Sequence, residues 1–222
     1  GVLRGYWEER DDWAVEVCDA TTADWQQLCH LGKLWEIAVW EPVSKRPEFR
    51  TLVQRNQSSL RTLIFRYCSL SPEIALAIGD AGRVNCLNFS GATNGLKRFA
   101  VAPLPDLKEV GFLSGDVSDE NLAWIAHQPA VTEVSIVYNK AITDATARTL
   151  TSCKSLRTLN LSGTSVSADG MRMLMDQLTL RELSFPAVQL DEADLTAMVD
   201  SELERIDLKH VDLTASIAPL FQ

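Results

Sequence analysis

Apolar residues follow one short pattern along this chain: an apolar residue, two others, a second apolar residue, one other, and a third apolar residue. The pattern occurs at residues 34–39, 60–65, 84–89, 107–112, 131–136, 156–161, 180–185 and 203–208, so its starts lie 23 to 26 residues apart. The alternation in its second half is typical of a short β-strand with one buried face. A nearly fixed period of this size indicates a chain built from stacked structural repeats.

A second pattern lies between these strands and predicts a helix in most repeats. A Ser, Thr or Asp stands where a helix would begin, and apolar residues follow four and seven positions later, on one helical face. Ser167, followed by Met171 and Leu174, is the clearest example. The corresponding caps in other repeats are Ser71, Ser118, Thr143 and Asp191. Acidic residues occupy the same first turns, where the helix dipole favours them.

The same template extends towards the N-terminus and identifies two exceptions. Thr21 is a further helix cap, and Val15 and Val17 predict a degenerate ninth strand before the first clear repeat. Residues 41–47 are longer than the template and contain two prolines, and residues 91–105 contain two glycines and two closely spaced prolines. Because proline favours extended backbone over helix, we expect these two repeats to depart from the helix rule, with an irregular convex segment.

Residues 156–174, which read LRTLNLSGTSVSADGMRML, resemble a leucine-rich repeat of the ribonuclease-inhibitor and cysteine-containing kind. Cys68, Asn139 and Cys153 stand where such repeats often have Cys or Asn, whereas most other repeats here have Ala, Gly, Thr or Val at the turn position. The resemblance covers roughly residues 12–213. It implies a parallel-sheeted horseshoe and, most often, recognition of another protein. Related repeats occur in F-box substrate receptors, nuclease inhibitors and a GTPase-activating protein, so the fold alone does not choose a function.

The expected fold is therefore an α/β leucine-rich-repeat solenoid, a right-handed horseshoe. About nine parallel strands would line its concave face, and short helices its convex face. We expect one domain over residues 1–222: a degenerate tryptophan-rich cap repeat at 1–33, eight repeats at 34–213 and a C-terminal end at 214–222. The 46% of hydrophobic residues is sufficient for a continuous core.

The concave face is the candidate functional surface. Strand alternation turns the residues beside each buried position outward, and aromatic and Arg residues dominate the energetics of protein interfaces. Glu109 and Glu133 should be neighbours there, because they occupy equivalent positions of consecutive repeats. An alternative is a solvated face whose charges only keep the protein soluble. The candidate partner-binding residues are Trp40, Arg66, Tyr67, Glu109, Glu133, Tyr138, Glu182, Arg205 and Asp207.

The charge distribution limits the classes of partner. The net charge is −9, with acidic ends at residues 1–48 and 181–222 and a nearly neutral centre. This distribution argues against a nucleic-acid partner and is compatible with a basic protein. Two other functions remain open: an inhibitor or immunity-type protein that neutralises a basic enzyme or toxin, and a GTPase-activating or other enzyme regulator.

The sequence contains no recognisable pattern of catalytic or metal-binding residues, which favours a non-enzymatic protein. The three histidines lie in different repeats, and no spacing indicates a metal site, a cofactor site or catalytic residues. No apolar run is long enough for a membrane span. Five cysteines without paired spacing favour reduced thiols and hence a cytoplasmic location, although a leader could precede Gly1. We also expect the protein to be a monomer.

Overall fold

Nine parallel strands form one open sheet in which the strands follow their order in the sequence. The computed structural model describes residues 13–18, 20–41, 44, 46–93, 100–199, 201–209 and 212–213. The strands of the sheet are Trp13–Val17 (β1), Leu34–Trp40 (β2), Thr62–Arg66 (β3), Cys86–Ser90 (β4), Glu109–Leu113 (β5), Glu133–Val137 (β6), Thr158–Asn160 (β7), Glu182–Ser184 (β8) and Arg205–Asp207 (β10). Gln189–Leu190 (β9) and Asp212–Leu213 (β11) pair separately. The predicted solenoid architecture is confirmed.

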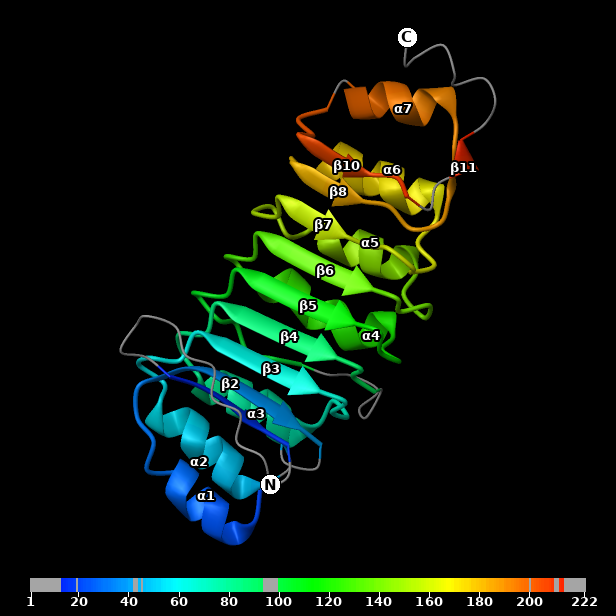
Figure 1. Ribbon diagram of the computed structural model, residues 1–222. Helices are drawn as coiled ribbons and strands as arrows, with labels where there is room; N and C mark the ends of the chain where they lie inside the picture. The colour runs from blue at the N-terminus through cyan, green and yellow to red at the C-terminus, as the bar shows by residue number, and fades with distance from the viewer. Residues whose placement is uncertain are drawn as a thin grey trace.

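The helices pack against one face of this sheet. They are Thr22–Leu28 (α1), Pro47–Arg55 (α2), Pro72–Asp80 (α3), Asp119–Leu122 (α4), Asp144–Leu150 (α5), Ala168–Gln177 (α6) and Glu192–Val199 (α7), and a 3-10 helix over Ala123–His127 continues α4. Along β5 to β8, helices α4, α5 and α6 lie behind the strands (Figure 1). No described helix covers the opposite face of these strands, which we call the helix-free face. None of the described helices has the length and apolarity needed to cross a bilayer.

The core lies between the strands and the helices, as the apolar pattern predicts. Four phenylalanine rings run along it, with centroid separations of 6.0 Å from Phe49 to Phe65, 5.0 Å from Phe65 to Phe89 and 4.6 Å from Phe89 to Phe112. All four are almost completely buried. Phe65, Phe89 and Phe112 are register partners on adjacent strands, so each repeat contributes one ring to a continuous stack.

The predicted helix starts are also confirmed. Thr21, Ser71, Ser118, Thr143 and Ser167 are the N-cap residues of α1, α3, α4, α5 and α6. The side chains of Thr21, Ser71 and Ser167 each accept a hydrogen bond from the backbone N–H three residues later. The apolar residues four and seven positions after each cap are buried, except Ala75, which is partly buried.

The acidic residues of the first turns also join neighbouring helices, which the sequence did not predict. The carboxylate of Asp119 in α4 accepts hydrogen bonds from the backbone N–H of Thr143 at 2.9 Å and from its hydroxyl at 2.7 Å. Asp144 in α5 does the same for Ser167, at 2.8 and 2.7 Å. Each of these acids therefore holds the cap of the next helix.

Between α6 and α7, the side chain of an arginine joins the neighbouring helices. Arg172 forms ion pairs with Asp169 in its own helix and with Asp194 in α7, whose side chain is only 1% exposed. Burial alone would raise the pKa of Asp194, but the Arg172 guanidinium and the backbone N–H of Asp191 lower it below its usual value. The ion pair therefore keeps this buried carboxylate charged.

Two expectations about irregular repeats have different outcomes. The repeat containing residues 41–47 does carry a helix, because Pro47 occupies the first turn of α2, where its missing N–H costs nothing. The expected departure from the helix rule is therefore wrong there. Residues 100–108 contain no helix, as expected, while residues 94–99 lie outside the described residues.

The core pattern weakens at β10, the last strand of the nine-stranded sheet. Ile206 of β10 is 37% exposed, whereas the equivalent residue Leu183 of β8 is 1% exposed. Leu203 and Leu208 are only partly buried. The expected boundaries of the cap repeat and of the C-terminal end stay a prediction, because residues 1–12 and 214–222 lie outside the described part of the chain.

Candidate protein-binding face

The parallel register arranges the outward side chains of the helix-free face in rows that cross the strands. The row at the strand starts, which we call the acidic row, contains Glu36, Thr62, Cys86, Glu109, Glu133, Thr158, Glu182 and Arg205. The middle row contains mostly small residues: Ala38, Ile64, Asn88, Gly111, Ser135, Asn160, Ser184 and Asp207. A third row lies at the strand ends, with Trp40, Arg66, Ser90, Leu113 and Val137.

Glu133 lies near the centre of the acidic row, between Glu109 on the neighbouring strand and Glu182 two strands away. It is the register partner of Glu109, about 4.8 Å away at the backbone. Its pKa is raised, first because the sheet face partly removes it from water, and then because Glu109 and Glu182 lie nearby. Glu182 pairs with Arg205 at 3.3 Å, whereas Glu133 has no ion pair with any described residue. The centre of the row therefore holds excess negative charge.

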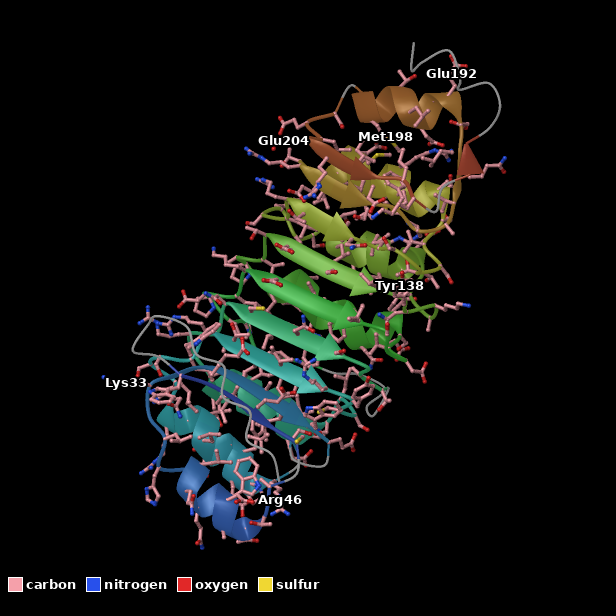
Figure 2. The ribbon with its side chains drawn as sticks, in the orientation of Figure 1. Lys33, Arg46, Tyr138, Glu192, Met198 and Glu204 are labelled. Carbon is pink, nitrogen blue, oxygen red and sulfur yellow. The ribbon has the colours of Figure 1, made fainter. Side chains whose placement is uncertain are left out.

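A second row, with exposed and half-buried apolar side chains on either side of Arg66 and Ser90, runs along the other side of the same face; we call its apolar members the apolar row. It consists of Trp40, Leu113 and Val137 at the strand ends and of Tyr67 and Tyr138 in the turns that follow. Tyr67 is 60% exposed, Tyr138 58% and Leu113 44%. The rings of Trp40 and Tyr67 are in contact, with centroids 5.2 Å apart. Figure 2 shows Tyr138 at the tip of β6, on the side opposite the strand starts.

Both tyrosines occupy strained turns and pack over a glycine of the next repeat. Their φ angles are 52° for Tyr67 and 56° for Tyr138, in the left-handed region that favours glycine. A Cβ added to Gly91 would lie 2.5 Å from Cδ1 of Tyr67, and one added to Gly163 would lie 2.5 Å from Cδ1 of Tyr138. The two glycines thus leave the space that the rings occupy. Their spacing of one repeat after each tyrosine was the only signal of this arrangement in the sequence.

A polar hollow of about 300 Å³ lies on β6, β7, β8 and β10. Its polar lining combines carboxylates, small hydroxyl and amide side chains and the guanidinium of Arg205, which pairs with Glu182: Glu133, Ser135, Thr158, Asn160, Glu182, Ser184, Arg205 and Asp207. Four of the candidate residues, Glu133, Glu182, Arg205 and Asp207, meet here. The hollow therefore has the size and the polarity to receive a long cationic side chain.

The other candidate residues lie elsewhere on the same face. Glu109 is next to Glu133, and Tyr138 follows the same strand as Glu133. Trp40, Arg66 and Tyr67 lie towards the N-terminal end of the sheet. There, the indole N–H of Trp40 donates to Glu16 at 2.8 Å, and Arg66 pairs with the same carboxylate at 3.0 Å. Arg66 is therefore already neutralised by the protein itself.

Several other residues of the turns and of the face have structural contacts. The side chain of Asn139 donates to the carbonyls of Phe112 at 3.1 Å and Val137 at 2.9 Å, the turn-bonding role that the repeat resemblance implies.

Cys86 belongs to the acidic row, and burial raises the pKa of its thiol to about 12. In the described part of the chain, no group of His, Cys, Asp and Glu side chains could hold a metal ion.

A match to a family sequence model supports the repeat architecture. Residues 152–175 match the sequence model of the family described as Leucine Rich repeat. Among solved structures, a protein from Bacteroides fragilis aligns with 86% of this chain and 71% of its own, at 12% identity and a TM-score of 0.48, which is too low to support an inference. No curated protein matches the sequence.

Proposed function

Because the chain is a leucine-rich repeat protein, we propose that it recognises another protein, of basic character, through the helix-free face of its sheet. In this role it is a non-enzymatic adaptor or recognition arm. The observation that carries the proposal is the pair Glu109 and Glu133, which are register partners beside an exposed row of apolar side chains. The proposed contact residues are Trp40, Arg66, Tyr67, Glu109, Glu133, Tyr138, Glu182, Arg205 and Asp207.

The electrostatics of this pair favour a cationic partner. Two carboxylates on adjacent strands repel each other. The pKa of Glu133 is raised first by partial loss of water and then by this repulsion. A lysine or arginine of a partner would relieve the repulsion and gain an ion pair, so binding stabilises an arrangement that is unfavourable in the free protein. The net charge of −9 would also accelerate association with a basic surface.

The apolar row supplies the other component of a protein interface. Exposed tyrosine and tryptophan side chains are the residues that contribute most to binding in such interfaces. Tyr67 is held by Trp40 and by the neighbouring glycine turn, and Tyr138 by the turn at Gly163, so little side-chain freedom is lost on binding. A face that only keeps the protein soluble would not require exposed aromatic side chains in strained turns.

The test compares two double variants with equal charge change. Glu109→Gln with Glu133→Gln removes the charged pair, and Glu120→Gln with Glu202→Gln removes two exposed carboxylates outside the helix-free face. A partner captured on the immobilised protein is identified, purified and titrated with each variant at low and at high salt. The first variant should weaken binding and reduce its salt dependence, whereas the second should change neither. Equal effects of the two variants would place the interface elsewhere.

The identity of the captured protein separates the two functions that use this face. A ligase or signalling complex supports an adaptor. A single basic enzyme or toxin, inactivated on binding, supports an inhibitor, which the net charge favours but the nearly neutral centre of the sequence does not.

A further inference from the structure

From the spacing of the rows on the helix-free face, we infer that the bound segment of the partner is an amphipathic α-helix, basic along one side and apolar along the other. The helix would lie across β5 to β8 and perpendicular to the strands. This inference rests on the proposed function and specifies the partner's chemistry and secondary structure. It depends on two matches between the sheet and an α-helix, one across the face and one along it.

The first match is the distance between the acidic row and the apolar row. Glu133 and Val137 stand at the two ends of β6, four residues apart, and Tyr138 follows directly. At about 3.3 Å per residue the rows are therefore about 13 Å apart. An α-helix with its side chains is about 10–12 Å across. A single helix between the rows would place its two sides against Glu133 and Tyr138 at the same time.

The second match is the spacing along the rows. Adjacent strands are about 4.8 Å apart, and one turn of an α-helix rises about 5.4 Å. A helix that crosses the strands therefore presents about one turn to each strand. Cations at positions i and i+4 would meet Glu109 and Glu133, and a further cation two turns later would meet Glu182. An extended segment, which rises about 3.3 Å per residue and alternates its faces, has no such correspondence with the rows.

The middle row permits a helix to approach closely. Gly111, Ser135 and Ser184 have minimal side chains at the centre of β5, β6 and β8. Asn160, the remaining member over these strands, has its side-chain oxygen bonded to the backbone N–H of Ser162 at 3.0 Å, which holds its amide down in the turn. These residues project little from the sheet. The acidic row forms one rim of a shallow trough over β5 to β8, and Leu113, Val137 and Tyr138 form the other rim over β5 and β6.

The polar hollow completes the fit on the basic side of the helix. It opens between Glu133 and Glu182 and reaches the hydroxyl and amide groups of Thr158 and Asn160. Thr158 interrupts the acidic row here, so a long side chain such as arginine extends past the row and donates to the hollow's oxygen atoms. On the opposite side, Leu113 and Tyr138 offer exposed apolar surface to the apolar side of the helix.

Designed peptides test the inference directly on the full chain. The first peptide, about five helical turns long, has Arg at positions i, i+4, i+7 and i+11, Leu at i+2, i+5, i+9 and i+12, and Ala elsewhere. A second peptide has the same composition in scrambled order, so that Arg and Leu no longer occupy separate sides. A third keeps the order of the first but contains proline at two Ala positions, which prevents a helix.

Separate variants test the acidic row and the apolar row. Glu109→Gln with Glu133→Gln removes the charged pair, and Glu120→Gln with Glu202→Gln is its control. Tyr138→Ser removes an apolar anchor and introduces the residue found at the equivalent position of the previous repeat, Ser114, whose φ is 50°. The fold of every variant is verified by its melting temperature before the titration.

The inference predicts that only the first peptide binds strongly. The pair of glutamine substitutions should weaken it by about five-fold or more and reduce the salt dependence, because exposed ion pairs each contribute modestly. Tyr138→Ser should weaken it similarly with unchanged salt dependence, since it removes apolar contact. Equal binding of the scrambled or the proline peptide would overturn the helix and indicate general electrostatic attraction or an extended ligand.

The experiment separates failure of this inference from failure of the proposed function. If the captured partner loses affinity for the double glutamine variant while the helical peptide does not bind, the face is the recognition site and the helix is wrong. If both the partner and the peptide bind the double glutamine variant with unchanged affinity, the proposed function fails as well.

Discussion

Replacing Gly163 by alanine tests whether the ring of Tyr138 is held against the next repeat. Gly163 has a φ of 72°, and a Cβ there would lie 2.5 Å from Cδ1 and 3.2 Å from Cα of Tyr138. The left-handed backbone costs an alanine about 1–2 kcal/mol. Displacement of the ring adds about 1–3 kcal/mol, as for other overpacked sites. The free energy of unfolding should therefore fall by roughly 2–5 kcal/mol.

Two other glycines isolate the two contributions. Gly82 has a φ of 59° with no atom within 4 Å of an added Cβ, so Gly82→Ala should lose only about 1–2 kcal/mol. Gly79 lies inside α3 with equally open space, so Gly79→Ala should gain about 0.5–1 kcal/mol.

Urea denaturation measures these changes through the midpoint at constant slope. The decisive measurement repeats Gly163→Ala in a Tyr138→Ser background, where the ring is absent and the loss should fall towards that of Gly82→Ala, with only the 3.2 Å contact to the backbone Cα of residue 138 remaining. If Gly163→Ala costs no more than Gly82→Ala in the parent protein, the ring does not occupy the space above Gly163, and our description of the turns is wrong.

Three further predictions concern the core, the thiols and the acidic row. Leu159→Ala or Leu183→Ala should cost about 2–5 kcal/mol, because both side chains are 1% exposed; an unchanged melting temperature would contradict the strand register. Mass measurement after alkylation without reductant should find five free thiols. Cys86 and Cys153 should react slowly at mildly alkaline pH, because burial raises the pKa of the Cys86 thiol to about 12 and that of the Cys153 thiol to about 11. Glu133→Gln should raise the melting temperature at neutral pH. The pKa of the Glu133 carboxyl is raised in the folded protein, so this group stabilises the fold fully only below its unfolded pKa of about 4.3. The stabilisation is lost as the pH rises through the folded pKa. The gain should shrink as the pH falls towards about 4, and a constant gain would show that ionisation is not its cause.

The repeats and the neighbouring glutamates were predictable from the sequence because both depend on periodicity alone. Once the period is known, equivalent residues such as Glu109 and Glu133 must lie side by side in a parallel sheet. The burial of Leu159 follows in the same way from strand alternation. Helix caps such as Ser167 were equally accessible, because a cap and the N–H that it accepts lie three residues apart.

The contacts between repeats were not predictable, because they depend on side-chain direction and on how the repeats stack. The Asp119 carboxylate was assigned to its own helix dipole, while its hydrogen bonds go to Thr143 in the next repeat. The orientation of Tyr138 over Gly163 follows from a left-handed φ that nothing in a tyrosine favours. The start of α2 was missed because Pro47 was interpreted as part of an irregular segment and not as a first-turn proline.

The bonds from Asp119 to Thr143 and from Asp144 to Ser167 point in one direction along the chain. If a repeat at the C-terminal end opens, the helix before it keeps both its own cap and the carboxylate that supports that cap. If a repeat at the other end opens, the next helix loses its carboxylate. Local unfolding is therefore asymmetric over α4 to α6: opening that proceeds inward from α6 leaves the caps of α4 and α5 intact, and α5 keeps the carboxylate that supports its cap. Since β7, β8 and β10 each have three residues while β3 to β6 have five, amide hydrogen exchange should slow steadily from β10 back towards β5.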